Sequence, residues 1–326
     1  MRIFSGIQPT GAKHFGNYSG GFRQYAATQD LGDAFFCIVD LHSLTTPQDP
    51  EGLREATLDL AAMLLATGLD PGRSTIFLQS HVPAHTQSAW IASCVATYGD
   101  LRRMTQFKEK GEGQESVSAG LFMYPALMAA DILLYQTDKV PIGDDQRQHL
   151  ELTRNVAERF NSRYGETFKL PEAIYPETGA RVMDLQEPER KMSTTGGTPQ
   201  GTIGLLDPPD TVRRKVRSAV TDSGSAVRRA EDKPGITNLI DIMAVATGST
   251  PEEIESRYDS SGYGKFKEEV AEAVVAVLDP IRLRYGELRG NPDELRAILA
   301  GGAAKAEAIA SETLRTVYDR VGLVSS

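Results

Sequence analysis

The stretch Phe4-Ser-Gly-Ile-Gln-Pro-Thr-Gly-Ala-Lys-His-Phe-Gly-Asn17 decides the fold of this chain. Its first residues belong to Arg2–Ser5, whose short apolar character is typical of a buried strand. A turn that contains two glycines and a proline follows. A helix is predicted to begin near Gly16. Unpaired N–H groups and the positive dipole end at the start of a helix favour a phosphate. The stretch therefore predicts a strand–turn–helix junction suited to a nucleotide.

Polar side chains stand at the predicted start of this helix. His14 and Asn17 can both donate hydrogen bonds, and donors placed there can stabilise charge that develops on a reacting phosphoryl group. The alternative is that His14 is a surface residue in an ordinary loop between a strand and a helix. A second motif far downstream, Lys191-Met-Ser-Thr-Thr195, favours the functional interpretation.

Together, the two motifs resemble the signatures of class I aminoacyl-tRNA synthetases, which read His-Ile-Gly-His and Lys-Met-Ser-Lys-Ser. Here they stand as His14-Phe-Gly-Asn17 and Lys191-Met-Ser-Thr-Thr195. The preceding Gln8-Pro-Thr-Gly11 resembles the tryptophan-specific members of that family. The resemblance covers nearly the whole chain, because further segments match bacterial members in order and spacing: Cys37–His42, Arg103–Lys110, Tyr124–Tyr135, Gly143–His149 and Ser218–Ser223.

Composition limits the classes of function. A chain of 326 residues can bury a large core and is predicted to hold two domains. No run of about 18 apolar residues and no signal region is found, so we expect a cytoplasmic protein without a membrane segment. Cys37 and Cys94 are too few for a cysteine-based metal site, and we predict no protein-bound metal.

The formal net charge of −9 argues against a general polyanion binder and against DNA as a partner. A specific RNA partner requires clustered basic residues, and one segment supplies them. The alternative is that this segment is only a solvated helix face. The clustered residues are Arg213, Arg214, Lys215, Arg217, Arg228, Arg229 and Lys233.

Strands that alternate with helices predict an α/β fold with a parallel, Rossmann-like sheet. Beyond the first strand, the apolar runs that predict strands are Ala34–Asp40, Ser74–Gln79, Lys139–Gly143 and Arg181–Met183. In such a sheet, ligands bind beyond the carboxyl ends of the strands. Neither common nucleotide fingerprint occurs, so ATP must be held by another arrangement.

The predicted domain organisation follows from this pattern. Residues 1–190 form the catalytic domain with a helical insertion at about 82–136, residues 191–195 form a mobile signature loop, and residues 196–326 form an all-α domain. The resemblance implies that the all-α domain binds the anticodon and that its last helix packs back on the catalytic domain. It also implies that the insertion carries the contact of a homodimer and reaches the acceptor end of tRNA.

Asp131 is conspicuous because it lies within a strongly apolar predicted helix, 117–135. A buried carboxylate is costly unless it is paired or hydrogen-bonded, and the alternative is an exposed position on the polar edge of the helix. The resemblance implies that Asp131 accepts the indole N–H of tryptophan, a group that can only donate. The apolar walls of that pocket would be Phe4, Gly6, Met128, Val140 and Ile142, and its polar ends Tyr124, His42 and Gln146.

Two histidines near the start of the predicted insertion are candidates for metal ligands. His81 and His85 have helical ligand spacing, but Pro83 stands between them and no carboxylate accompanies them, so zinc is disfavoured.

The resemblance further implies an ATP site with Mg²⁺. Its binding residues would be Gln8, Pro9, Thr10, Gly16, Asn17, Lys110, Gly143, Asp144, Asp145 and Val182, with Lys191, Met192, Ser193, Thr194 and Thr195 of the signature loop. His14, Asn17, Lys191 and Ser193 would be catalytic. Thr194 departs from the family, which has a second lysine there; Lys110, Arg181 or magnesium would then supply the missing positive charge.

The expected activity is ATP-dependent activation of L-tryptophan, followed by transfer to the 2′-hydroxyl of the terminal adenosine of tRNA(Trp). Alternatives are a tyrosyl-tRNA synthetase, a non-catalytic paralogue that senses tryptophan or nucleotide, a small nucleotidyltransferase, and a pure RNA-binding module.

Overall fold

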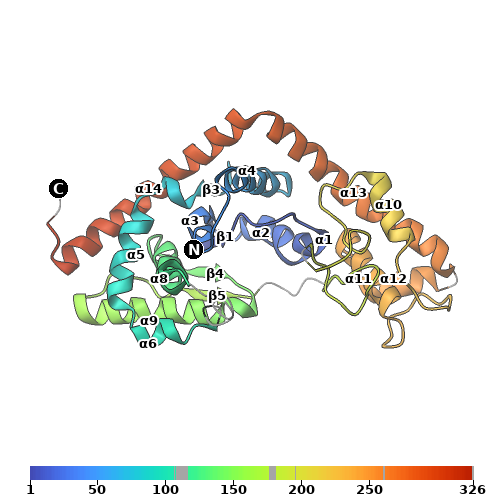
Figure 1. The fold of residues 1–326 in the computed structure, drawn as a ribbon, viewed down its shortest axis with the longest axis horizontal. Coiled ribbons are helices and arrows are strands. Elements are labelled where there is room, and N and C mark those ends of the chain that lie inside the picture. The colour runs from blue at the N-terminus through green and yellow to red at the C-terminus, as the bar shows by residue number, and fades with distance from the viewer. Residues whose placement is uncertain (106, 108–116, 176–180, 195, 260, 325–326) are drawn as a thin grey trace.

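The computed structural model of the chain describes residues 1–105, 107, 117–175, 181–194, 196–259 and 261–324 (Figure 1). Within these residues, no helix is both long and apolar enough to span a membrane. The predicted alternation of strands and helices gives an α/β body, and helices alone follow residue 191 along the described part of the chain.

A five-stranded parallel sheet lies at the centre of the α/β body. Its strand order places the first strand in the middle, so the chain winds to one side through β2 and β3 and then crosses to the other side. A change of winding direction at the carboxyl end of a strand leaves a crevice for ligands. The order across the sheet is β3 (Thr75–Leu78), β2 (Asp33–Ile38), β1 (Arg2–Ile7), β4 (Lys139–Pro141) and β5 (Glu172–Ile174).

One predicted strand is wrong. Arg181–Met183 is not part of the sheet; Met183 forms only an isolated antiparallel bridge with Lys191. Its backbone is bound instead by Asn238, whose Oδ1 accepts the Met183 N–H at 2.8 Å and whose Nδ2 donates to the Met183 carbonyl at 2.9 Å. The last strand is β5, a short edge strand without an apolar run, so its sequence gave little signal.

The first helix is interrupted where a continuous helix is predicted. α1 (Phe15–Asn17) runs into a π-helix (Tyr18–Phe22) and then α2 (Arg23–Thr28). A π-turn shifts the side chains that follow it relative to an α-helix and is frequent at functional sites.

Helices cover the sheet (Figure 1). Along the chain, the described part of the segment that connects β3 to β4 is helical, where the sequence predicts a helical insertion. α8 packs against both α5 and α9. A short 3₁₀ turn, Gln79–His81, leads from β3 into α5, and a second, Asp144–Gln146, leads from β4 into α9. The helices of this half are α3 (Asp40–Ser43), α4 (Pro50–Ala66), α5 (Ala84–Val95), α6 (Tyr98–Arg102), α8 (Ala119–Leu133) and α9 (Arg147–Tyr164).

The remaining helices lie after residue 191, and two of them begin at side-chain caps. Thr250 accepts the N–H of Glu253 and Asn291 accepts that of Glu294, each with a proline at the first helical position. These helices are α10 (Pro209–Arg217), α11 (Pro234–Thr247), α12 (Pro251–Tyr258), α13 (Gly262–Gly290) and α14 (Pro292–Val321). α13 and α14 follow one another along the top of Figure 1, and α14 packs on β3 and α5.

Gly302 sets how closely α14 approaches the sheet. A Cβ atom added to Gly302 would lie 1.9 Å from the carbonyl oxygen of Ile76 in β3, whereas one added to Gly301 meets nothing within 4 Å. We expect Gly302→Ala to lower the free energy of unfolding by about 1–3 kcal/mol or more, because backbone must move. Gly301→Ala should raise it by up to about 1 kcal/mol, since alanine favours the helix. Urea unfolding of both variants tests this, and equal effects would contradict it.

Candidate functional site

The His14–Asn17 motif forms a reciprocal cap at the start of α1. Nδ1 of His14 accepts the N–H of Gly16 at 3.1 Å, and Oδ1 of Asn17 accepts the N–H of His14 at 2.9 Å. The Phe15 N–H donates to the Ile203 carbonyl at 2.9 Å, so the motif is also tied to the chain beyond the signature loop. The Phe15 ring is fully buried. The motif is therefore fixed by hydrogen bonds within itself and by one to the backbone of Ile203.

His14 is uncharged in this setting. Burial lowers its pKa to about 4, and the positive charges of Lys191 and Lys13 act in the same direction. Because Nδ1 accepts a hydrogen bond, the single proton of the neutral ring is on Nε2. The side chain can therefore donate one hydrogen bond to an anion from Nε2.

A titration tests this state of His14. Its Cε1–H resonance, assigned by its loss in His14→Gln, should titrate near pH 4. The folded pKa is below the unfolded value of 6.5, so the contribution of His14 to the free energy of unfolding is complete above about pH 6.5 and is lost as the pH falls toward 4. His14→Gln should flatten that part of the stability profile. A resonance that titrates above about pH 6 would contradict the assignment.

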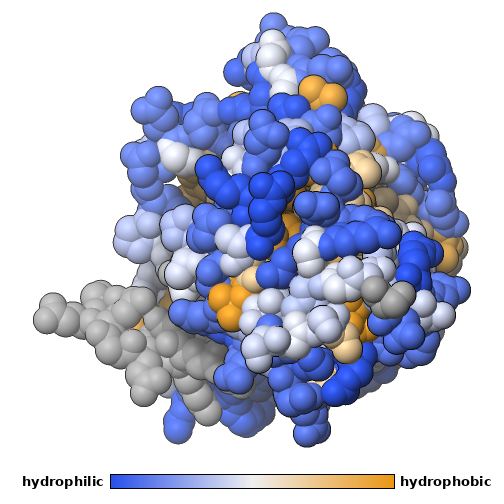
Figure 2. All heavy atoms as spheres, turned by 90° about the vertical axis from the view of Figure 1, so that its right-hand side faces the viewer, coloured by the Kyte–Doolittle hydropathy of each residue, from blue (hydrophilic) through white to orange (hydrophobic). Residues whose placement is uncertain are grey.

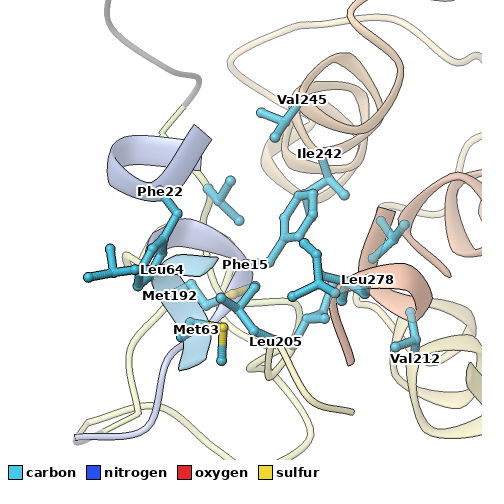
Figure 3. Packing of buried hydrophobic residues seen from close by; sticks show 14 of the residues in the cluster. Phe15, Phe22, Met63, Leu64, Met192, Leu205, Val212, Ile242, Val245 and Leu278 are labelled. Atoms are coloured by element: carbon cyan, nitrogen blue, oxygen red, sulfur yellow. The ribbon is translucent and has the colours of Figure 1, made fainter. Parts of the chain in front are cut away.

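The signature segment begins with Lys191, which lies close enough to the His14–Asn17 motif for its charge to act on His14. Lys191 bridges to Met183, the Met192 N–H donates to the Val182 carbonyl at 3.2 Å, and the charge of Lys191 is felt at His14. The side chain of Met192 lies in the hydrophobic cluster with Phe15, so only its backbone can face a nucleotide (Figure 3). The structure thus brings together two motifs from opposite ends of the α/β half.

The loop after Met192 also contacts the first junction. The Thr194 hydroxyl lies 3.5 Å from the carbonyl of Ala12, and the Ser193 carbonyl accepts the Thr202 hydroxyl at 2.9 Å. Lys13 is next to Ala12, and its amine donates to the Thr10 carbonyl. The predicted ATP residues Lys110 and Thr195 lie outside the described residues. Lys13 is not among the predicted site residues, and its positive charge contributes to the lowered pKa of His14.

Residues predicted to form the amino-acid pocket surround one cavity of about 270 Å³. It lies beyond the carboxyl ends of β1 and β4 and is closed by α8. Val39, Thr45, Ile132 and Pro141 also line it and were not predicted. All the predicted residues are present in its lining: Phe4, Gly6, His42, Tyr124, Met128, Asp131, Val140, Ile142 and Gln146, together with Gln8 from the predicted ATP set.

Asp131 is buried and hydrogen-bonded, so the exposed alternative does not hold. Its side chain is 1% exposed, and its Oδ2 lies 2.9 Å from Nε2 of His42 and its Oδ1 2.6 Å from Nδ1 of His85. Nε2 of Gln79 donates to both oxygens at 2.8 Å. Burial by itself would raise the pKa of Asp131, but the hydrogen bonds from His42 and His85 outweigh it and hold the pKa well below its usual range. The carboxylate is ionised at neutral pH.

Two of the polar residues that line the cavity, His42 and Tyr124, have different hydrogen-bond partners. His42 lies at the Asp131 end, whereas Tyr124 reaches His149, with its hydroxyl 2.7 Å from Nε2. Burial raises the pKa of Tyr124 to about 12, so its hydroxyl stays protonated. Gln79 and His85 were not predicted as site residues. A buried aspartate needs donors, which was a usable signal, but the sequence does not say which residues provide them.

The remaining predicted ATP residues lie near the start of α9. Gly143 and Asp145 follow β4, and Oδ2 of Asp145 accepts a hydrogen bond from Gln146 Nε2 at 2.6 Å. No side-chain hydrogen bond caps α9 at its N-cap residue, Gln146. The side chain of Asp144 is outside the described part of the structure. Among the described residues, no group of three or more His, Cys, Asp or Glu side chains is arranged to hold a metal ion.

This combination of a parallel sheet, a capped strand–turn–helix junction, a signature segment and an amino-acid-sized cavity defines a class I aminoacyl-tRNA synthetase. The family model for class I tRNA synthetases of the tryptophan and tyrosine type matches residues 1–279. The chain belongs to this family. Within it, the chain groups with the bacterial tryptophan–tRNA ligases, as its resemblance implies.

The relatives support that grouping over the full length. A tryptophan–tRNA ligase of Caldanaerobacter subterraneus is 52% identical over 324 residues, covering 99% of this chain and 98% of the relative. One of Listeria monocytogenes is 52% identical over 322 residues, covering 98% and 97%. The tryptophanyl-tRNA synthetase of Campylobacter jejuni, solved with ADP and tryptophan, superposes with a TM-score of 0.86 at 38% identity, covering 99% of this chain and 100% of that one.

Proposed function

We propose that this chain uses ATP to convert L-tryptophan to tryptophanyl-adenylate and then charges tRNA(Trp). The observation that carries the proposal is the cavity beyond β1 and β4, which presents an ionised, buried Asp131 to its occupant and is also lined by Gln8 of the strand–turn–helix junction. An acceptor buried among apolar walls selects a ring that bears an N–H donor. A tyrosine-specific relative would use the same framework for a different ring.

The chemistry requires positioning and charge stabilisation. The tryptophan carboxylate attacks the α-phosphorus of ATP, the bond to the β-phosphate oxygen breaks, and pyrophosphate leaves with the electron pair. The 2′-hydroxyl of the terminal adenosine then attacks the activated carbonyl, and AMP leaves. Donors around the phosphates lower the barrier without covalent catalysis. Gln8 lines the cavity, neutral His14 donates from Nε2, and Lys191 adds a positive charge.

Magnesium would enter as part of the substrate, Mg–ATP. Because the described residues contain no carboxylate cage for a metal, the phosphate oxygens and water would supply its ligands, as Mg²⁺ commonly prefers. Its charge would partly replace that of the lysine absent at Thr194.

The all-α region would hold tRNA through exposed basic side chains. Of the clustered residues, Arg213, Lys215, Arg229 and Lys233 form ion pairs with Glu272, Asp207, Asp241 and Asp222. Arg214, Arg217 and Arg228 are exposed. Hydrophilic residues cover most of this end of the molecule (Figure 2). The cluster thus divides into cations that stabilise the helices and cations open to phosphate.

A homodimer formed through the insertion helices is the proposed assembly. Trp90 in α5 is 71% exposed and Tyr98 in α6 is 69% exposed, unusual for large aromatic side chains. We expect Trp90→Glu to convert a dimer into a monomer, measured by sedimentation at micromolar concentrations. Leu283→Glu is the control, since Leu283 is also exposed but lies in α13. A wild-type monomer, or a dimer that survives Trp90→Glu, would contradict the proposal. A cytoplasmic location stays a prediction.

Pyrophosphate exchange with each of the twenty amino acids, followed by tRNA charging, tests the proposed activity. Exchange with tryptophan and charging of tRNA(Trp) are expected. Preference for tyrosine would support a tyrosyl-tRNA synthetase, exchange without charging a nucleotidyltransferase, and neither reaction a non-catalytic paralogue.

A further inference from the structure

The two oxygens of Asp131 face different surroundings. Oδ2 is bound by His42, which lines the cavity. Oδ1 is bound at 2.6 Å by His85, which is fully buried and lies behind the carboxylate, outside the cavity lining. Nε2 of Gln79 donates to both oxygens at 2.8 Å. His85 therefore holds the carboxylate from behind at Oδ1, and Oδ2 is the oxygen on the side of the cavity-lining His42.

His85 is itself fixed at its second nitrogen. The hydroxyl of Tyr135 lies 2.8 Å from Nε2 of His85, and a hydroxyl that donates to Nε2 leaves the ring proton on Nδ1, where it can be donated to Asp131. The Tyr135 ring is fully buried and stacks on Phe35 at 5.0 Å and on Phe4 at 5.4 Å between ring centroids. Packing of the Tyr135 ring thus positions its hydroxyl, and that hydroxyl determines the tautomer of His85. The tautomer in turn lets His85 donate to Asp131 and fix the orientation of the carboxylate.

We propose that His85, supported by Tyr135, is a positioning residue for substrate selection: it keeps Oδ2 of Asp131 aimed into the cavity as the acceptor for a ring N–H. This inference rests on the proposed role of Asp131. His85 does not line the cavity and acts through Asp131 alone. His81, the other histidine of the sequence pair, is exposed and has no part in it.

Loss of the His85 donor changes what the cavity can recognise. Without His85, Asp131 keeps its hydrogen bonds to His42 and Gln79 but loses the one that holds Oδ1 from behind, so its orientation is less restrained and it is more readily protonated. A substrate with a ring N–H then meets a less well oriented acceptor, whereas an isostere without the N–H had no such bond to weaken. If His85 is a positioning residue, its loss should therefore change the ratio of kcat/KM for tryptophan to kcat/KM for an isostere without the ring N–H.

The experiment compares the full-length chain with His85→Leu and His85→Asn. Pyrophosphate exchange is measured with tryptophan and with 3-benzothienylalanine, in which sulfur replaces the ring N–H. His85→Leu should lower the ratio of the two kcat/KM values about tenfold or more, the size of one hydrogen bond to a charged group, and leave the KM for ATP unchanged. His85→Asn should keep most of the ratio, because its amide N–H stands where Nδ1–H stood. An unchanged ratio in His85→Leu would overturn the proposal.

Tyr135→Phe keeps the test decisive if His85→Leu does not fold. It removes only the hydroxyl and should lower the same ratio several-fold; no change would again count against positioning. Asp131→Ala separates the two proposals. If it abolishes the ratio while the His85 and Tyr135 variants do not, only the positioning role fails. If Asp131→Ala also leaves the ratio unchanged, the proposed role of Asp131 fails.

Discussion

Replacing Lys191 by alanine should slow adenylate formation by about 10²–10³-fold, the cost of removing one donor that stabilises transition-state charge. Lys191 is exposed, whereas Met192 beside it is buried in the core and bonded to the Val182 backbone, so the charge of Lys191 is open to an anion while the adjoining backbone is anchored. The lining of the cavity proposed for tryptophan does not include Lys191, so the affinity for tryptophan should change little.

Pyrophosphate exchange and equilibrium binding of tryptophan measure the two effects separately. Arg190→Ala is the matched control, because it removes a neighbouring positive charge that is paired with Glu187. Exchange unchanged in Lys191→Ala, or lost equally in Arg190→Ala, would refute the role assigned to Lys191. Restoring a second lysine by Thr194→Lys in the same assay would show how far the missing charge limits the rate.

Replacing Asp131 by alanine should remove most of the selection for tryptophan. A site built around a buried polar partner rejects an analogue that lacks the matching group by about 10⁴–10⁵-fold, and phenylalanine lacks the N–H. Asp131→Ala also leaves His42, His85 and Gln79 without their shared acceptor, so a loss of stability should accompany the loss of selection.

The measurement is the ratio of kcat/KM for tryptophan and phenylalanine, together with a thermal melt. Asp131→Asn is the conservative comparison: it keeps the volume and one acceptor oxygen but loses the charge, so we expect an intermediate ratio. Discrimination against phenylalanine that survives in folded Asp131→Ala would exclude the carboxylate as the selecting group.

The residues that the resemblance assigns to the amino-acid pocket line one cavity, and the topology of the sheet explains why they lie together. Gly6 lies near the end of β1 and Gln8 follows it, Val140 and Ile142 lie in and after β4, and Met128 lies on α8 near Asp131. Once the strands are assigned to a parallel sheet, their carboxyl ends meet at one edge, and the side chains there must converge.

Local sequence signals were sufficient to predict most helices and strands, but they gave a wrong strand at Arg181–Met183. Helices that begin at Asp49, Thr250 and Asn291 carry their caps and prolines within a few residues. The Arg181–Met183 segment looked like a strand, but Asn238 of α11 binds its backbone instead. Nothing within the segment itself could reveal that partner.

By itself, the amino-acid sequence determined the α/β architecture, the helix starts and the two signature motifs, because each depends on residues close together in the chain. Tertiary structure alone decided that His85 and Tyr135 stand behind Asp131, that β5 rather than 181–183 completes the sheet, and which clustered arginines stay exposed. Those outcomes depend on hydrogen bonds and ion pairs between residues far apart in the chain, and such pairings are fixed only when the packed core brings their elements together.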